Sequence, residues 1–273
     1  MDTALPERCP RGVYRHRLPV RITHWLNLIV LVVMLGSGLQ IFNAHPALYW
    51  GERSDPERAW LAMAAIVDPH TGERRGITRL FGREYDTTGV LALSDGTPRG
   101  FPAWSTIPSD RWLAMGRRWH FFFAWVLVLN GLAYLAWGFA SRHVSRDLWL
   151  RGDEARHLPR TLKSHLSLRA LRADAEQGYN PLQKITYLVV IFVMLPLMVL
   201  TGLAMSPWLD AAFPALITTF DGRQSARSIH FIITFGLVLF TLVHVLMVFA
   251  VGPLRELRAM ITGWFTPREQ GHD

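Results

Sequence analysis

The hydrophobic residues of this 273-residue chain are concentrated in four long blocks, separated by segments rich in charged residues, glycine and proline. Each block is long enough to cross a bilayer as a helix, and the apolar residues do not follow the periodic spacing of soluble domains. The pattern therefore predicts four transmembrane helices, at residues 22–42, 119–140, 182–206 and 227–251. We expect an all-α integral membrane protein, a four-helix bundle that forms a single domain over residues 1–273.

The polar segments between the blocks predict the topology. The N-terminal tail, the 141–181 connection and the C-terminal tail are basic, whereas the 207–224 link has one arginine against two aspartates. Cytoplasmic loops carry an excess of Lys and Arg, so both termini and the 141–181 connection are expected in the cytoplasm. The 43–116 connection then lies outside, and it is too long to be a simple loop.

Two local features refine this picture of the spans. Pro196 lies within the third block and is expected to kink that helix, since proline removes a hydrogen bond from the helix interior. Leucines at helical spacing in the 141–181 connection predict an interfacial amphipathic helix. They are Leu158, Leu162 and Leu166.

Composition and cysteine count narrow the class of protein. Half of the residues are hydrophobic, and the formal net charge of +8 is carried between the blocks. A basic chain also suits nucleic-acid binding, but that function does not explain four apolar spans, so we expect no nucleic-acid partner. Cys9 is the only cysteine, which excludes a disulfide framework, a thiolate-bound Fe–S cluster and covalently attached haem. The first block lacks a small-residue cleavage site and is expected to be a retained span.

Four of the eleven histidines fall within the apolar blocks, where ionisable residues are costly and usually functional. His230 and His244 share the fourth block, about 21 Å apart along the helix and within about 40° of one face. The topology places His24 and His244 near the inner membrane face, and His120 and His230 near the outer face. The four therefore form two pairs at two depths, and the third block, without a histidine, is expected only to support the bundle.

Two imidazoles from facing helices supply both axial ligands of a low-spin haem iron, which then suits one-electron transfer. We predict two b haems, the inner one on His24 and His244 and the outer one on His120 and His230. Copper or a proton relay would also use histidines, but a relay would be expected to include buried Asp or Glu, which the spans lack. Methionine ligation stays open, although methionine in apolar spans is usually packing.

Two glycines lie where a porphyrin would need space. Gly38 follows His24 by fourteen residues and Gly138 follows His120 by eighteen, so each shares the face of its histidine at the depth of the opposite haem. Small residues also occur at ordinary contacts between membrane helices, so this spacing alone does not decide between the two roles.

An arginine precedes three of the four histidines by three residues, as Arg-x-x-His. These are Arg21, Arg117 and Arg227. At this spacing the two side chains share a helix face, with the arginine one turn nearer the membrane edge. A guanidinium fork matches the carboxylate of a haem propionate. The alternative is an arginine that extends to the lipid headgroups.

These motifs resemble those of a known superfamily. Residues 21–25 (Arg-Ile-Thr-His-Trp), residues 117–121 (Arg-Arg-Trp-His-Phe) and the two histidines of the fourth block are similar to the dihaem cytochrome b subunits of respiratory oxidoreductases. This superfamily includes the gamma subunit of formate dehydrogenase, the b-type cytochrome of Ni,Fe-hydrogenase and the bacterial cytochrome b561 proteins. Residues 99–104 and 222–230 resemble the thiosulfate-reductase-type cytochrome b branch.

The resemblance implies a function in electron transfer rather than in substrate conversion. It implies a subunit of the bacterial cytoplasmic (inner) membrane that passes electrons between a periplasmic redox partner, often a molybdopterin enzyme, and the quinone pool. Its axial ligands correspond to the four span histidines. The long 43–116 connection suits a docked partner, or a lid over the outer haem.

Two other functions stay open. One is a stand-alone cytochrome b561-type enzyme that exchanges electrons between quinone and a small species such as superoxide or ferric ion. The other is a non-redox transporter or anchor, which would show no haem spectrum.

Overall fold

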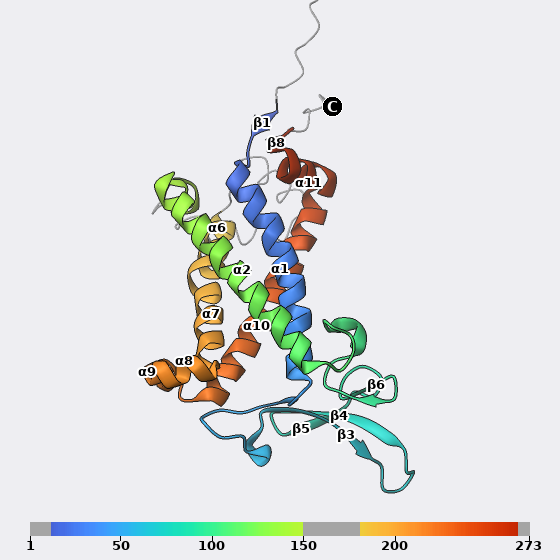
Figure 1. Ribbon diagram of the computed structural model, residues 1–273. Helices are drawn as coiled ribbons and strands as arrows, with labels where there is room; N and C mark the ends of the chain where they lie inside the picture. The colour runs from blue at the N-terminus through green and yellow to red at the C-terminus, as the bar shows by residue number, and fades with distance from the viewer. Residues whose placement is uncertain (1–11, 150–180, 267–273) are drawn as a thin grey trace, which may run out of the picture. The chain divides into compact units, whose positions relative to one another are not determined.

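The computed structural model describes residues 12–149 and 181–266. Four helices in these ranges are long and apolar enough to cross a membrane: Leu18–Phe42, Leu113–Ala140, Pro181–Ala204 and Arg223–Val251. The four predicted spans are therefore confirmed (Figure 1). Each helix begins before its predicted first residue. The second and fourth begin six and four residues earlier, where charged or polar side chains such as Arg117 and Arg223 lie outside the hydrophobic pattern.

Three spans are single α-helices, and the third is divided. The single helices are α1 (Leu18–Phe42), α2 (Leu113–Ala140) and α10 (Arg223–Val251). The third span consists of α6 (Pro181–Val189), the π-helix η4 (Val190–Met194) and α7 (Leu195–Ala204). Pro196 is the second residue of α7, two positions after the π-helix ends. A proline cannot donate to the preceding turn, and a wider π turn is one way in which a helix accommodates that loss.

The remaining elements are short. The strands are β1 (Val13–Tyr14), β2 (Ala47–Leu48), β3 (Leu61–Val67), β4 (Arg74–Leu80), β5 (Arg83–Asp86), β6 (Leu93–Ser94), β7 (Thr97–Pro98) and β8 (Trp264–Phe265). The helices are η1 (Pro56–Arg58), η2 (Ala103–Ser105), the π-helix η3 (Val144–Leu148), α8 (Pro207–Ala212), α9 (Pro214–Thr219) and α11 (Pro253–Thr262).

The chain divides into two compact units, and every spanning helix contributes residues to both. Unit 1 comprises Met1–Leu26, Gly131–Phe192 and Val238–Asp273, and unit 2 comprises Asn27–Asn130 and Val193–Leu237. The histidines follow this division: His24 and His244 belong to unit 1, and His120 and His230 belong to unit 2. The single domain expected over the whole chain stays a prediction.

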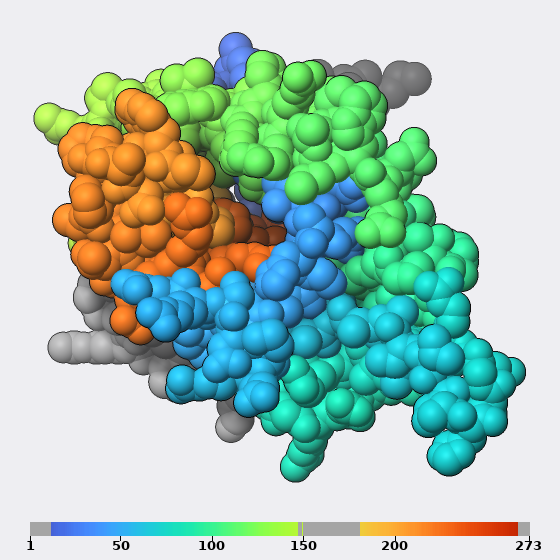
Figure 2. Space-filling view, turned by 60° about the horizontal axis from the view of Figure 1, so that its bottom comes forward, coloured from blue at the N-terminus to red at the C-terminus, as the bar shows by residue number. Residues whose placement is uncertain are grey.

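The connection between α1 and α2 gives unit 2 a β-structure that the sequence did not predict. Its strands form an antiparallel sheet in the order β2-β3-β4-β5, beside a β6-β7 hairpin. Strands β3 and β4 pair along their whole length, from Leu61↔Leu80 to Val67↔Arg74. Figure 2 shows this connection, coloured blue to green, next to the orange segment that contains α8 and α9. The backbone NH groups of Gln224 and Ser225, in the first turn of α10, donate to the Gly51 carbonyl and join the connection to that helix.

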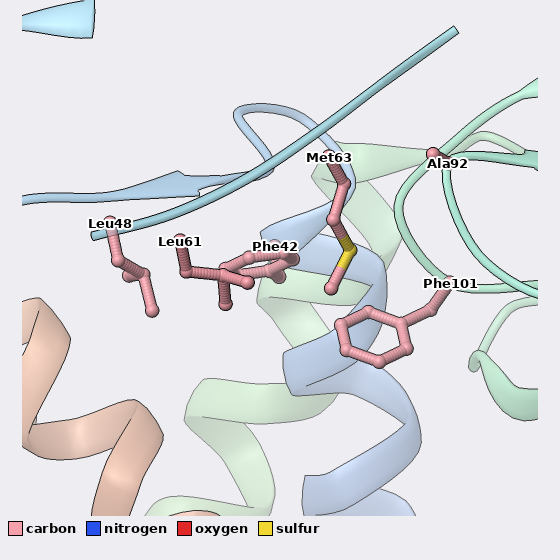
Figure 3. Close-up of a cluster of buried hydrophobic side chains, with 6 residues drawn as sticks. All are labelled: Phe42, Leu48, Leu61, Met63, Ala92 and Phe101. Atoms are coloured by element: carbon pink, nitrogen blue, oxygen red, sulfur yellow. The ribbon is translucent and has the colours of Figure 1, made fainter. Parts of the chain in front are cut away.

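A hydrophobic cluster attaches the sheet to the end of α1. Its buried members are Phe42, Leu48, Leu61, Met63, Ala92 and Phe101. Figure 3 shows the side chains from β2 and β3 directed toward the Phe42 and Phe101 rings, whose centres are 5.5 Å apart. Burying apolar area in this way contributes on the order of 25 cal/mol per Å². The outer connection is therefore folded, with a hydrophobic core that it shares with the end of α1.

In unit 1 the segments close to the two chain ends pair with each other. Strands β1 and β8 are antiparallel, with Val13↔Phe265 and Tyr14↔Trp264 in register. Gly263, between α11 and β8, has φ +89°, a left-handed conformation that favours glycine. The interfacial helix predicted around Leu158, Leu162 and Leu166 lies outside the described residues.

Candidate functional site

The outer histidine pair lies in unit 2. His120 on α2 and His230 on α10 have ring centres 6.3 Å apart and ring planes at 59°. Each histidine reaches this position from the first half of its helix, since α2 begins at Leu113 and α10 begins at Arg223. The structure thus brings together the two residues that the sequence pairs at the outer depth.

The inner pair lies in unit 1 and has nearly the same geometry. His24 on α1 and His244 on α10 have ring centres 6.2 Å apart and ring planes at 61°. Trp25 lies edge-on to the His24 ring, and the Phe240 ring stacks on His244 at 6.1 Å between centres. Aromatic neighbours on both imidazoles limit the rotation of the rings.

Both separations fit a metal held between two imidazoles. A metal–nitrogen bond is about 2 Å and that nitrogen is about 1 Å from its ring centre, so two imidazoles on opposite sides of one metal have centres about 6 Å apart. Among the described residues, no group of three or more His, Cys, Asp or Glu side chains is placed to hold a metal. Each site therefore offers two axial donors, the set that suits a metal which brings its other ligands with it, as in haem.

A serine on α1 orients His120 of the outer pair. The Ser37 hydroxyl donates to the Val33 carbonyl at 2.6 Å and lies 3.1 Å from His120 Nδ1. Since the hydroxyl proton is used within the helix, the Ser37 oxygen accepts the Nδ1–H proton of the imidazole. That tautomer leaves the lone pair of His120 Nε2 available to a metal.

Thr201 on α7 does the same for His230, the other histidine of the outer pair. Its hydroxyl donates to the Leu197 carbonyl at 2.8 Å and lies 3.0 Å from His230 Nδ1. Thr201 is fully buried. Both outer imidazoles are therefore held in one orientation and one tautomer by a hydroxyl on a neighbouring helix.

A glycine follows each of these hydroxyl residues and makes room for the ring. A Cβ atom on Gly38 would lie 3.3 Å from His120 Cε1, and one on Gly202 would lie 3.4 Å from His230 Cε1. Gly38 thus lies at the outer pair, at the depth that its spacing from His24 predicts.

Ser37, Thr201 and Gly202 were not among the predicted site residues, and the third span was expected only to support the bundle. The signal that could have found them is a repeated tripeptide. Ser37-Gly38-Leu39 in the first span corresponds to Thr201-Gly202-Leu203 in the third. In each tripeptide the hydroxyl accepts a hydrogen bond from the imidazole, and the glycine leaves space for the imidazole ring on the same turn of helix.

The inner pair is built differently. Nδ1 of His24 is buried and has no hydrogen-bond partner among the residues that the structure describes. Gly138 lies in the same unit, where an added Cβ would be 3.0 Å from Val144 Cγ2. That contact is between α2 and the following η3 and involves no histidine, so the role of Gly138 stays a prediction.

The three arginines of the Arg-x-x-His motifs have individual contacts. Arg21 Nε donates to the Met260 carbonyl at 3.3 Å, and Arg227 donates to the His45 carbonyl. The Arg117 guanidinium lies over the Phe121 ring at 5.6 Å from its centre. Arg21 and Arg227 thus tie the first turns of their helices to segments far away in the sequence, and binding of propionates stays a prediction.

Comparison with known proteins identifies the family. Residues 87–263 match the family described as prokaryotic cytochrome b561. A protein of Azospira oryzae named "putative protein-methionine-sulfoxide reductase subunit YedZ1" is 31% identical over 247 residues, which cover 89% of this chain and 93% of the relative. The chain belongs to the prokaryotic cytochrome b561 family. No solved structure matches it.

Cytochrome b561 proteins carry b-type haem, so this chain is a multi-pass membrane protein that transfers electrons through haem b. The matched segment contains three of the four span histidines, whereas His24 precedes it. The paired imidazoles described above are the donor set that a b-type haem requires. That the two histidine pairs hold haem stays a prediction.

Proposed function

We propose that this cytochrome b561 protein is a dihaem subunit that carries electrons between the quinone pool and an extracytoplasmic oxidoreductase. The observation that supports it most directly is the presence of two histidine pairs, with ring centres 6.2 and 6.3 Å apart. His24 and His244 would hold the iron of the inner haem, and His120 and His230 that of the outer haem. When bound, each haem supplies one-electron redox chemistry.

The proposed location is the bacterial cytoplasmic (inner) membrane, with both termini in the cytoplasm. The basic tails and the basic 141–181 connection support this orientation, since positive residues are retained on the cytoplasmic side. The folded connection between α1 and α2 then lies outside, together with the outer histidine pair. The inner pair lies on the side where quinone chemistry would exchange protons with the cytoplasm.

The identity of the relative suggests the partner and the direction of electron flow. The Azospira oryzae protein is named as a subunit of a reductase. We infer that this chain likewise serves an extracytoplasmic reductase, of the molybdopterin type that the sequence resemblance implies. Electrons would then enter from quinol at the inner pair and leave from the outer pair. The guanidinium groups of Arg21, Arg117 and Arg227 would bind haem propionates.

The folded connection offers a surface for such a partner. Phe81 is 73% exposed and has φ +47°, a left-handed conformation in which a bulky side chain is rare. Its ring stacks on Trp60, which in turn stacks on the exposed Trp50. An exposed aromatic ring held at an unfavourable backbone position suggests a binding role, since aromatic side chains are enriched at protein interfaces.

This aromatic stack is also joined to the helix that carries an outer ligand. Trp60 Nε1–H donates to the Ser228 hydroxyl at 3.0 Å, and Ser228 precedes His230 by two residues. Ser228 in turn donates to the Tyr49 carbonyl. A partner bound over Phe81 would therefore contact a part of unit 2 that is directly attached to the outer pair, which favours docking on this surface over a lid function.

The test of the proposed function starts with haem stoichiometry. Purified protein should give a b-type spectrum with two haems per chain, both reducible by quinol under anaerobic conditions. Replacing Phe81 by Ala should slow reoxidation by the copurified reductase, whereas Val90→Ala, at another exposed position of the connection, should not. A chain with no haem or a single haem would sink the dihaem proposal. Rapid direct reoxidation by superoxide or ferric ion, without a partner, would favour the stand-alone enzyme.

A further inference from the structure

A fifth histidine of unit 1 lies two residues before α1, the helix that carries His24. His16 is only 7% exposed, and its Nδ1 atom is buried without a hydrogen-bond partner among the described residues. Most buried polar atoms in proteins are hydrogen-bonded, and leaving one unpaired costs about 1–3 kcal/mol. A nitrogen in this position is therefore suited to bind an oxygen atom of a ligand.

The backbone around His16 is fixed by the pairing of the two terminal segments. The NH groups of Arg15 and His16 both donate to the Gly263 carbonyl, at 2.8 and 3.2 Å. A Cβ atom on residue 263 would lie 2.6 Å from the Tyr14 ring and 3.0 Å from the His16 carbonyl oxygen, so only glycine fits without a shift. His16 is thus held by a rigid local structure rather than by a free tail.

The same turn places the first arginine motif beside His16. The Met260 carbonyl on α11 accepts hydrogen bonds from Arg21 Nε and from Trp25 Nε1, each at 3.3 Å. A Cβ atom on Gly263 would also lie 3.3 Å from Arg21 Nη1. The His16 backbone and the Arg21 guanidinium therefore converge on one turn, at the end of α1 that carries His24.

The charges in this cluster favour an acidic ligand. Burial, followed by the nearby Arg15, His24 and Arg21, lowers the pKa of His16 to about 4, so its imidazole is neutral at pH 7. Arg15 is paired with Glu256 at 3.7 Å, which leaves Arg21 as the guanidinium of this cluster that is best placed for a carboxylate. A neutral N–H donor beside a guanidinium is a common arrangement around a bound carboxylate.

We propose that the Nδ1–H group of His16 donates a hydrogen bond to a propionate carboxylate of the inner haem and, with Arg21, completes its binding site. This inference rests on the proposed dihaem function and assigns a residue to the inner site outside the four spans. His16 is then a positioning residue that acts on the electrostatics of the inner haem. It does not ligate the iron.

The experiment uses the full-length, haem-loaded protein and the variant His16→Leu. Both haems should be retained. The ratio of ferric to ferrous inner haem at a fixed potential should rise three- to tenfold. For a one-electron couple this corresponds to a midpoint potential lower by about 30 to 60 mV. The potential falls because loss of the N–H dipole leaves the propionate charge less compensated, which favours ferric iron. The outer haem should keep its potential.

Two further variants make the result specific. His16→Asn places an amide donor near the Nδ1 position and should restore most of the potential, whereas His70→Leu, at an exposed site of unit 2, should change neither haem. An unchanged inner potential with both haems present would overturn the proposal. So would a shift that His16→Asn does not reverse, or a loss of quinone-analogue affinity without a shift. Absence of haem from the unmodified protein would instead refute the proposed function.

Discussion

The hydroxyl of Thr201 provides a sharp test of how this protein controls its outer haem site. Thr201 accepts the Nδ1–H proton of His230 at 3.0 Å while donating to its own helix at the Leu197 carbonyl. Thr201→Val removes the hydroxyl and keeps the branched shape, so packing around this fully buried side chain is nearly preserved. The variant therefore removes one interaction from the ligand imidazole.

The expected magnitude follows from the energy of that bond. A neutral hydrogen bond contributes about 0.5–1.5 kcal/mol net, and tenfold in an equilibrium constant corresponds to about 1.4 kcal/mol, or about 59 mV for one electron. Acceptance of the Nδ1–H proton makes the imidazole more basic and favours ferric iron. Loss of this hydrogen bond should raise the midpoint potential of the outer haem by about 20 to 60 mV. The upper value applies if the bond stabilises only the ferric state.

A matched control is available in the same span. Thr186 donates to the Leu182 carbonyl at 2.8 Å, the same bond to the preceding turn that Thr201 makes, but it lies in α6 and in unit 1. Potentiometric titration of the α band should show one of two midpoints raised in Thr201→Val and neither changed in Thr186→Val. Repeating the titration in a His24→Ala background, with only the outer haem expected, assigns the shift.

The reasoning fails if Thr201→Val leaves both midpoints within a few millivolts of the unmodified protein while both haems are retained. A fall in the midpoint potential of the outer haem, identified as the haem that His230→Leu removes, would also refute it. In the first case the hydroxyl does not act on the ligand, and in the second its proton is directed at the imidazole rather than at Leu197.

Three other predictions follow from the same structure. His230→Leu should remove the outer haem alone and His244→Leu the inner haem alone, and haem counts that stay at two in either variant would contradict the pairing. Gly38→Val, which places atoms at the His120 ring, should lose the outer haem, whereas Gly236→Ala should be tolerated because its Cβ would meet only the flexible end of Met194. Phe81→Asn should stabilise the outer connection by about 1 kcal/mol, measured by proteolysis, since Asn tolerates the left-handed conformation. The same variant should slow electron delivery to the partner, and an unchanged rate would argue against docking at Phe81.

The spans and the histidine pairing could be predicted because both are strong local signals. An apolar block of twenty residues excludes most structures other than a transmembrane helix. A histidine inside such a block has a definite depth in the membrane once the topology is known. The start of each helix was placed too late, because residues such as Arg117 and Arg223 extend a helix without adding hydrophobicity. These errors do not move a histidine to another depth.

The parts that sequence reasoning missed depend on contacts between distant segments. Pairing of β1 with β8 joins residues about 250 positions apart, and no local pattern in two-residue strands announces it. The sheet of the outer connection has strands such as β5, exposed along its whole length, with no apolar alternation to detect. Thr201 was missed because a threonine in a membrane helix usually bonds its own backbone, which it also does here.

The two histidine pairs have the same spacing but different hydrogen bonding, and this difference bears on the direction of electron flow. Both outer imidazoles donate to hydroxyls, through Ser37 and Thr201, which favours the ferric state of the outer haem. His24 has no such acceptor among the described residues, so in the proposed orientation the outer haem would be the weaker oxidant of the two. Outward transfer would then be opposed by about 40 to 120 mV, twice the effect of one such bond. It would also be favoured by the membrane potential, since moving one electron fully across to the positive outer side releases about 2.3 kcal/mol per 100 mV. A membrane potential above about 120 mV therefore outweighs the two hydrogen bonds, so quinol oxidation at the inner pair can supply a reductase outside. Collapsing the membrane potential in proteoliposomes should therefore slow reduction of the outer haem more than that of the inner haem.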